Sequence, residues 1–298
     1  MLLALVTLYE LLAQGVIDAR VPAHRDWSAA SRHIREHHRD GDLIVSAPAW
    51  TDPLLRRELG DLLPAAQAGR SDLAPFARVW EISARGRRAA DLVAVREARE
   101  PDETSTFGAL TVRRFDLGPS SVAFDLTSNL RDAQVRRGDR TCTWRRSTAQ
   151  GGGLGTGPLT PAEHFFCGPE PWLWVGETVT EDLDLQPRHC IWQHPAGTEP
   201  ITTTYRNVAL PGRVVLHGGI YYLHERERIH GPVDVRVLVE GREVGRMRHE
   251  DGDGWRRMEA DTGTGTGDVT IEVTAPDANM RTFCWAADLR GPAREVGE

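Results

Sequence analysis

Between Arg213 and Arg290, apolar residues alternate with polar ones in short runs that glycine, proline or aspartate residues separate. The runs read VVLHGGIYYL, VDVRVLVEG, VGRMRHE, WRRMEAD, DVTIEV and RTFCWAADLR. Alternation with a period of two indicates strands with one face in a core and the other in solvent. Several such strands with frequent turns predict an antiparallel β-sandwich. Similar runs reach back to about Gly118, so the expected sandwich domain covers residues 118–298.

Residues 21–117 alternate helical and strand patterns instead. Asp26 is expected to cap a helix over residues 28–39, and Asp52 followed by Pro53 is expected to open a second helix. Strands are predicted at LIVSAPAW, RVWEIS and FGALTVRRF. This order favours a small α/β domain with a sheet of parallel type. The expected fold class is therefore α+β overall, a small α/β domain followed by a jelly-roll-like antiparallel β-sandwich.

Residues 1–20 form an apolar segment that Glu10 and Gln14 interrupt. A helix of this length approaches the thickness of a bilayer. The segment lacks the basic start and the small-residue cleavage site of a secretory signal. Three interpretations stay open: a membrane anchor, the tail of a longer hydrophobic segment, or a soluble helix packed on the first domain.

The charge of the chain restricts its partners and its chemistry. The net charge is -7, and all 36 basic residues are arginine. Without lysine the chain has no Schiff-base nucleophile and no phosphate-loop lysine. A mildly acidic protein also lacks the basic face that nucleic-acid binding requires, so no nucleic-acid partner is expected.

The four cysteines, Cys142, Cys167, Cys190 and Cys284, all lie in the β-rich half. Cys190 and Cys284 fall on predicted strands in similar contexts, CIW and CWA, which makes their pairing plausible. Two disulfides in an oxidising compartment and four buried thiols both fit the sequence. No pair has the CxxC spacing of a zinc ribbon.

Aromatic residues are the candidate ligand-binding groups, because sugars stack their C–H faces on such rings. Trp172 and Trp174 would share one strand face, as would Tyr222 and His224, and Trp255 follows a turn. Each ring taken alone is more typical of a core residue.

Asp251 and Asp253, in HEDGDGW, are the candidate metal ligands, because paired carboxylates in a strand-edge loop could hold a structural calcium ion. The alternative is a hairpin turn, since Asp-Gly favours tight turns. No other cofactor is expected.

No catalytic residue is predicted. HERERIH lacks the spacing of a zinc protease, no GxSxG element occurs, and GGGLGTG lacks the ending of a phosphate loop. A carboxylate pair of a glycosidase remains an alternative that spacing alone does not test. Its candidates are Glu177, Glu181, Asp182, Glu225 and Glu227.

The stretch DWSAASRHIREHHRDGDLIVSAPAWTDPLLRRELG resembles the soluble extracytoplasmic tail of bacterial GT-C class membrane glycosyltransferases. The residues that carry the resemblance are Asp26, Trp27, Ala29, Ala30, Ile34, Arg35, Gly41, Asp42, Pro48, Trp50, Leu55 and Arg56. The resemblance covers about residues 1–117 and implies a preceding polytopic membrane body. The catalytic carboxylates of that family lie in an early luminal loop that this chain does not contain. No catalytic residue can therefore be transferred to it.

The second half resembles galactose-binding-like jelly rolls and carbohydrate-binding modules in its strand rhythm and in the VRVLVEGREVG hairpin. Together the resemblances imply a non-catalytic accessory or carbohydrate-binding region, membrane-associated and extracytoplasmic, that serves glycosyl transfer in the cell envelope. Its partners would be a glycan or glycolipid and a membrane or membrane glycosyltransferase. The alternatives are a glycoside-acting hydrolase or lyase and a structural scaffold that binds protein partners.

Overall fold

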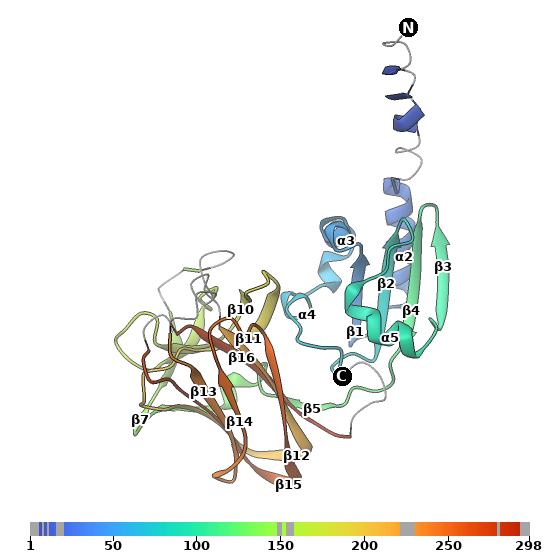
Figure 1. The fold of residues 1–298 in the computed structure, drawn as a ribbon. Coiled ribbons are helices and arrows are strands. Elements are labelled where there is room, and N and C mark those ends of the chain that lie inside the picture. The colour runs from blue at the N-terminus through green and yellow to red at the C-terminus, as the bar shows by residue number, and fades with distance from the viewer. Residues whose placement is uncertain are drawn as a thin grey trace. The chain divides into compact units, whose positions relative to one another are not determined.

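The computed structural model describes residues 6–7, 9–10, 12–15, 21–147, 151–152, 158–220, 230–278 and 281–292. The chain forms two compact units (Figure 1). The α/β unit comprises Met1–Pro64, Ala74–Ser120 and Glu295–Glu298, and the sandwich unit comprises Ala65–Leu73 and Ser121–Arg294. The nine residues Ala65–Leu73 therefore leave the first region and belong to the second unit, which the sequence pattern does not indicate.

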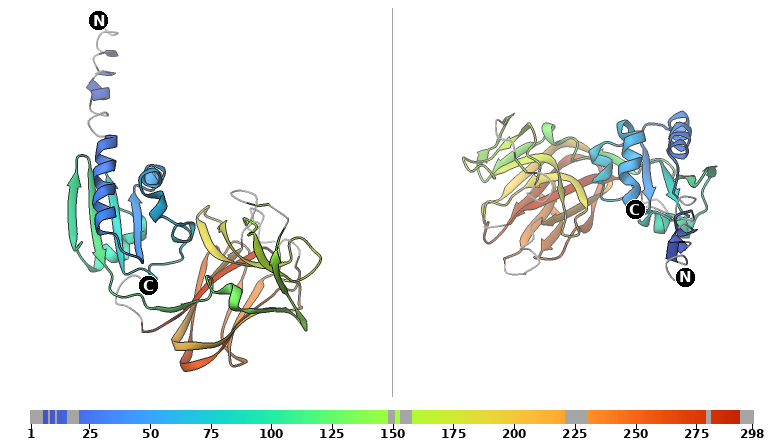
Figure 2. Two further views of the ribbon diagram at one scale, coloured as in Figure 1. Left: turned by 180° about the vertical axis from the view of Figure 1, so that it is seen from behind. Right: turned by 90° about the horizontal axis from the view of Figure 1, so that it is seen from above.

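The α/β unit is built on a four-stranded sheet in the order β1-β2-β4-β3. Its strands are β1 (Asp42–Ala47), β2 (Arg78–Ala84), β3 (Glu103–Phe107) and β4 (Leu110–Asp116), and its helices are α2 (His24–His37), α3 (Asp52–Leu59) and α5 (Val93–Ala98), with short 3-10 turns η1 (Ala49–Thr51), η2 (Gly60–Leu62) and η3 (Ala90–Leu92). Helix α2 lies on one face of the sheet and α5 on the other (Figures 1 and 2).

The prediction of a parallel sheet is wrong for this unit. Only β1 and β2 are parallel, whereas β2 pairs with β4, and β4 with β3, in antiparallel register. The run FGALTVRRF is one half of a hairpin, with Gly108 at φ 60 in the turn between β3 and β4. Two strands joined by so short a turn must run in opposite directions.

Helix α2 starts at His24 with Ala23 at the N-cap, so Asp26 is not the N-cap residue that the sequence predicts but the N3 residue of a capping box. Asp26 lies in the first turn, where its carboxylate accepts hydrogen bonds from the backbone of Ala23 at 3.1 Å and of Ala109 at 3.3 Å. The carboxylate thus ties the start of the helix to the β3–β4 turn. The apolar stripe Trp27, Ala30 and Ile34 is fully buried against the sheet.

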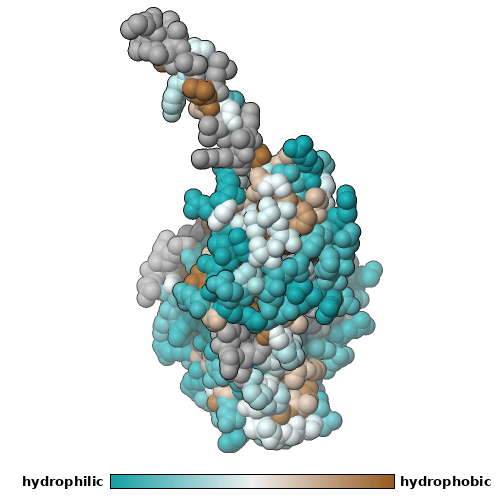
Figure 3. Space-filling view, turned by 90° about the vertical axis from the view of Figure 1, so that its right-hand side faces the viewer, coloured by the Kyte–Doolittle hydropathy of each residue, from teal (hydrophilic) through white to brown (hydrophobic). Residues whose placement is uncertain are grey.

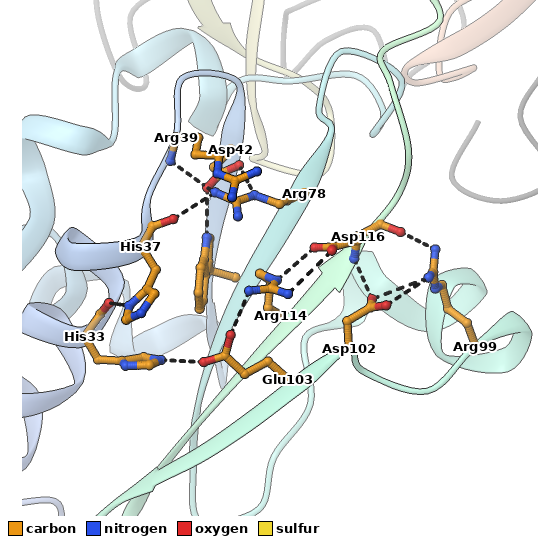
Figure 4. Close-up of polar contacts among 11 residues, drawn as sticks. His33, His37, Arg39, Asp42, Arg78, Arg99, Asp102, Glu103, Arg114 and Asp116 are labelled. Atoms are coloured by element: carbon orange, nitrogen blue, oxygen red, sulfur yellow. Dashed lines mark hydrogen bonds and ion pairs between the residues drawn. The ribbon is translucent and has the colours of Figure 1, made fainter.

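A network of ion pairs lies at the other end of the α/β sheet, where β1 and β2 begin (Figure 4). The carboxylate of Asp42 is 1% exposed and accepts hydrogen bonds from Arg78 at 2.6 Å and from the indole of Trp80 at 2.9 Å. Farther along, Glu103 contacts the ring of His33 at 2.8 Å and Arg114 at 2.7 Å. These contacts link β1 to β2 and link α2 through β3 to β4, which indicates a structural role for the network.

The sandwich unit confirms the predicted antiparallel β-sandwich. Its strands are β5 (Val122–Asp125), β6 (Gln134–Arg137), β7 (Arg140–Thr141), β8 (Thr143–Arg146), β9 (Glu163–Phe166), β10 (Trp174–Glu181), β11 (Pro187–Gln193), β12 (Ile201–Ile220), β13 (Val233–Val239), β14 (Arg242–His249), β15 (Arg256–Thr274) and β16 (Phe283–Arg290). The helical pieces are η4 (Leu130–Asp132) and α4 (Ala65–Ala68).

Two strands of unusual length join the two layers of the sandwich. The run VVLHGGI is only the second part of the single strand β12, and most of WRRMEAD belongs to β15 together with DVTIEV. The pairing of β12 with β15 is interrupted between Tyr205 and Val208 and between Gly212 and Arg213. Such bulges bend a strand. The first half of β12 therefore pairs with β6, and its second half pairs with β16.

Both disulfides that the sequence left open are formed. Cys142 is bonded to Cys167 and Cys190 to Cys284. The second bond joins β11 to β16 on the face turned away from the main core, in a small cluster with Trp174 and Trp192. Within the described ranges, no helix has both the length and the apolar composition that a membrane crossing requires.

Candidate functional site

The loops between β9 and β10, between β11 and β12, and between β15 and β16 come together at one end of the sandwich. The ring of Trp172, in the first loop, lies 4.4 Å from that of His194, which follows β11. The backbone of Ala275, after β15, donates to the carbonyl of Gly197 in the second loop. We call this set of loops the loop end. It is where the candidate residue Trp172 lies.

Trp172 and Trp174 do not share a strand face, because β10 begins only at Trp174. The Trp172 side chain is 41% exposed, and its carbonyl accepts a hydrogen bond from the indole of Trp192 at 3.4 Å. Trp174 is only 5% exposed and stacks on Trp192 at 5.6 Å. Its ring therefore has no surface left for a ligand and fills the packing between strands.

Charged side chains border the Trp172 loop. Glu170 stands two residues before the tryptophan, with Oε2 3.8 Å from Nη1 of Arg137. Arg137 also donates to Glu199 at 2.6 Å, and this hydrogen bond lowers the pKa of Glu199. The loop that carries Trp172 is thus bordered by an arginine and two carboxylates, the groups that hydrogen-bond hydroxyls in sugar sites.

The ring of His194, which is tilted against that of Trp172, is buried. Burial lowers the pKa of His194 to about 4, against the opposing effect of its hydrogen bond with the Pro195 carbonyl. Arg281 nearby lowers it further. The imidazole is therefore neutral at physiological pH. Neither His194 nor Arg281 was a candidate from the sequence, because only the fold reveals their burial.

The burial of His194 predicts that the sandwich unit loses stability in acid. A histidine with a pKa of about 4 when folded and 6.5 when unfolded contributes stability that is complete above pH 6.5 and is lost as the pH falls to about 4. The loss should be about 3 kcal/mol for His194. His217 has a similar pKa of about 4, and Asp288, raised by burial to about 6, opposes the trend. Urea unfolding at pH 7 and pH 4.5 measures the difference. The variant His194→Gln should show a smaller difference, and an unchanged one would contradict this assignment.

Trp255 packs beside the Cys190–Cys284 disulfide. Its indole donates to the hydroxyl of Ser71 at 3.2 Å, and the guanidinium of Arg188 sits over its ring at 5.5 Å. The pocket next to it has room for about one water molecule. Its lining consists of Thr180, Glu181, Asp182, Arg188, Gly219, Trp255 and Cys284. Trp255 is therefore partly buried, and its role as a sugar-stacking ring stays a prediction.

The two candidate calcium ligands point to different partners. Asp251 is 2% exposed and is bonded to Arg281 and to the backbone of His230, the latter at 2.7 Å. Asp253 accepts hydrogen bonds from the Glu250 backbone and from Arg256. Among the described residues no group of three or more His, Cys, Asp or Glu side chains is placed to hold a metal ion. Calcium here stays a prediction, and the ion would have to compete with Arg281.

The remaining candidates divide into two groups. Tyr222 and His224, with Glu225 and Glu227, lie outside the described residues. Of the other acids, Glu177 contacts His189 at 2.7 Å and Asp182 pairs with Arg188 at 2.7 Å. The Glu177 carboxylate is 45% exposed on β10, whereas that of Asp182, directly after β10, is only 4% exposed.

No protein-family model matches this sequence, and no curated protein matches it. Solved structures with a similar arrangement include the second family 51 carbohydrate-binding module, with the adjoining INT domain, of Clostridium perfringens ZmpB. It has 15% identity and a TM-score of 0.31, and the match covers 39% of this chain and 26% of that one. These neighbours are carbohydrate-binding modules. Tandem family 51 modules of a Streptococcus pneumoniae family 98 glycoside hydrolase have 9% identity and a TM-score of 0.35, and the match covers 62% of this chain and 56% of that one. A family 35 module from Clostridium thermocellum has 11% identity and a TM-score of 0.27, and the match covers 53% of this chain and 93% of that one.

Proposed function

We propose that the sandwich unit binds glycans at the loop end, with Trp172 as the stacking platform. The observation that supports this most directly is the 41% exposure of the Trp172 side chain, whose ring lies 4.4 Å from that of His194 and whose backbone carbonyl accepts a hydrogen bond from the Trp192 indole. A rigid, half-exposed ring loses little conformational entropy when a sugar stacks on it. Glu170 and Arg137 then supply hydrogen bonds to hydroxyl groups.

Glycan binding is tested by screening the full chain on a glycan array and measuring the dissociation constant of the best ligand for Trp172→Ala. We expect binding to weaken at least about fivefold, because a stacked ring at the centre of a site contributes about 1–3 kcal/mol. Trp50→Ala is the matched control. Trp50 is also exposed, at 64%, but it belongs to the α/β unit, so its replacement should leave glycan affinity unchanged. Absence of any ligand on the array, or equal affinity of Trp172→Ala and the parent, would reject the proposal.

The finer part of the proposal is that the chain is a non-catalytic, extracytoplasmic accessory of membrane glycosyl transfer in the cell envelope. Its support is the resemblance of residues 1–117 to the tail of GT-C class transferases and the apolar amino-terminal segment. The gene neighbourhood tests it directly. A polytopic membrane reading frame immediately upstream is expected, and a neighbourhood of unrelated genes would contradict the association.

A further inference from the structure

One face of strands β9, β10 and β11 is turned away from the main core of the sandwich. Trp174 lies on this outer face, in the small cluster around the second disulfide, whereas the next residue, Val175, lies in the main core. Phe165 also belongs to the main core. Because successive residues of a strand point to opposite faces, Phe166 lies on the outer face with Trp174.

Phe166, Trp174 and His194 form one row across the outer face. Phe166 is the direct partner of Trp174 in the pairing of β9 with β10. His194 lies one step beyond the last pair of β10 with β11, on the other side of Trp174. Neighbouring strands are about 4.8 Å apart, so the row is about 10 Å long. The exposed ring of Trp172 lies at its His194 end.

Arg145 lies at the other end of the row. It belongs to the edge strand β8, opposite His164 of β9, and its side chain is exposed. The guanidinium carbon of Arg145 lies over the ring of Phe166, 4.0 Å from the centroid. A guanidinium that stacks through its face keeps its N–H groups available for a planar acceptor. The stacking therefore gives an exposed arginine a defined position.

The charge of Arg145 is not neutralised by a carboxylate. Within the part of the chain that the structure describes, Arg145 makes no ion pair. The charges that border the Trp172 loop instead balance one another. Glu199 contacts Arg137 at 2.6 Å and Arg140 at 3.3 Å, and Glu170 lies 3.8 Å from Arg137. Arg145 therefore adds a positive charge to a surface on which two arginines face two carboxylates.

The neighbours of Arg145 along the chain and on β9 leave this charge in place. Burial lowers the pKa of His164, against the effect of its hydrogen bond with the Pro161 carbonyl, and Arg145 lowers it further, so the imidazole is neutral at physiological pH. Glu163 is the cross-strand partner of Arg146, which points to the other face of β8. Residues 147–162, which connect β8 to β9, include no aspartate or glutamate.

We propose that the glycan bound at Trp172 is acidic, and that Arg145 binds the anionic group of the sugar next to the stacked one. This inference rests on the proposed glycan binding and specifies its ligand class. A guanidinium binds a carboxylate through two parallel N–H···O hydrogen bonds, which neutral hydroxyls cannot replace. Two linked sugar rings span the length of the row, so one ring stacks on Trp172 while the acid of the second reaches Arg145.

The ligand class is tested on an array in which each acidic glycan stands beside its carboxyl-reduced, neutral form. Sulfated and phosphorylated glycans stand beside their unmodified forms, which distinguishes the three anionic groups. The full chain is expected to bind at least one acidic glycan about fivefold or more tightly than its neutral form, because hydrogen bonds to charged groups are the stronger ones.

The outcomes separate this inference from the proposed function. If both members of every pair bind equally and Trp172→Ala weakens both, glycan binding stands and the acid preference is refuted. If the parent chain binds no glycan, glycan binding itself is rejected, and the acid preference is rejected with it.

The role of Arg145 is measured on the best pair of glycans. Arg145→Gln should lower the affinity for the acidic form to that for the neutral form and leave the neutral affinity unchanged, which also shows that the variant is folded. Arg146→Gln, one residue away on the other face of β8, should keep the preference. A preference retained in Arg145→Gln would limit Arg145 to protecting the sheet edge and would overturn the proposal. An equal loss for both forms would overturn it as well.

A general attraction between arginines and acidic glycans is measured on the α/β unit. Hydrophilic side chains cover most of the face of this unit that Figure 3 shows. Arg32, on α2, is exposed like Arg145 and has neither an ion pair nor a ring partner among the described residues. Arg32→Gln should therefore leave the preference unchanged. A preference that falls equally in Arg32→Gln and Arg145→Gln would show attraction without a site and would refute the proposal.

Discussion

Replacing Arg78 with methionine is expected to lower the free energy of unfolding of the α/β unit by about 3–5 kcal/mol, because it leaves a buried charge without its partner. Burial alone would raise the pKa of Asp42, but hydrogen bonds from Arg78 and Trp80 outweigh burial and hold that pKa below its usual value. Without Arg78 the burial effect prevails. The pKa of Asp42 should then rise, and the loss of stability should be smaller in acid, where the carboxyl is neutral.

Hydrogen exchange of the β1 and β2 amides measures this loss within the α/β unit. Arg56→Met is the matched control. Its partner Asp52 is at the same distance, 2.6 Å, but the two side chains are 40% and 43% exposed. Exposed pairs of this kind contribute at most about 1 kcal/mol. Equal protection of the amides in the two variants would show that the burial of Asp42 has no energetic consequence.

Removing the Cys190–Cys284 disulfide by replacing both residues with serine should destabilise the sandwich unit by about 4–5 kcal/mol. Cys190 and Cys284 are 94 residues apart in sequence, so the bond between them removes much of the conformational freedom of the unfolded chain. Its sulfurs also pack in the cluster with Trp174 and Trp192, where a hydroxyl would meet few polar partners.

The second disulfide provides an internal comparison. Cys142 and Cys167 are separated by only 25 residues, so their double serine variant should lose about 3–4 kcal/mol by the same argument. Urea unfolding followed by tryptophan emission compares the two variants. A larger loss for the Cys142 and Cys167 pair would contradict a chain-entropy origin and would place most of the effect in local packing.

The sequence was most informative where structure depends on neighbours along the chain. Period-two alternation correctly predicts the antiparallel sandwich, and strand context correctly favours the pairing of Cys190 with Cys284. The sequence pattern predicts the wrong sheet type at Gly108, because the two-residue turn inside FGALTVRRF resembles an interruption of one strand. That single turn changes the sheet from parallel to mixed.

The candidate site was harder to predict, because exposure is a property of the whole fold. Trp172 and Trp174 have the same spacing that strand residues on one face have, yet one is exposed and the other is buried on Trp192. The partners of Asp251 and Trp255 are Arg281 and Ser71, and the second of these lies 184 residues away in sequence. No local pattern contains such pairings.

The segment Ala65–Leu73 belongs to the sandwich unit, although residues of the α/β unit flank it on both sides in the sequence. Gly69 lies so close to β11 that an added Cβ would stand 2.3 Å from the backbone nitrogen of His189, and Asp72 is bonded to the buried Arg290 at 2.8 Å. A gene fragment that starts after residue 120 would encode every strand of the sandwich and still omit the piece that covers the outside of β11 and β16. The module therefore cannot be transplanted into another protein by a single cut, and recombination would have to carry the preceding unit with it.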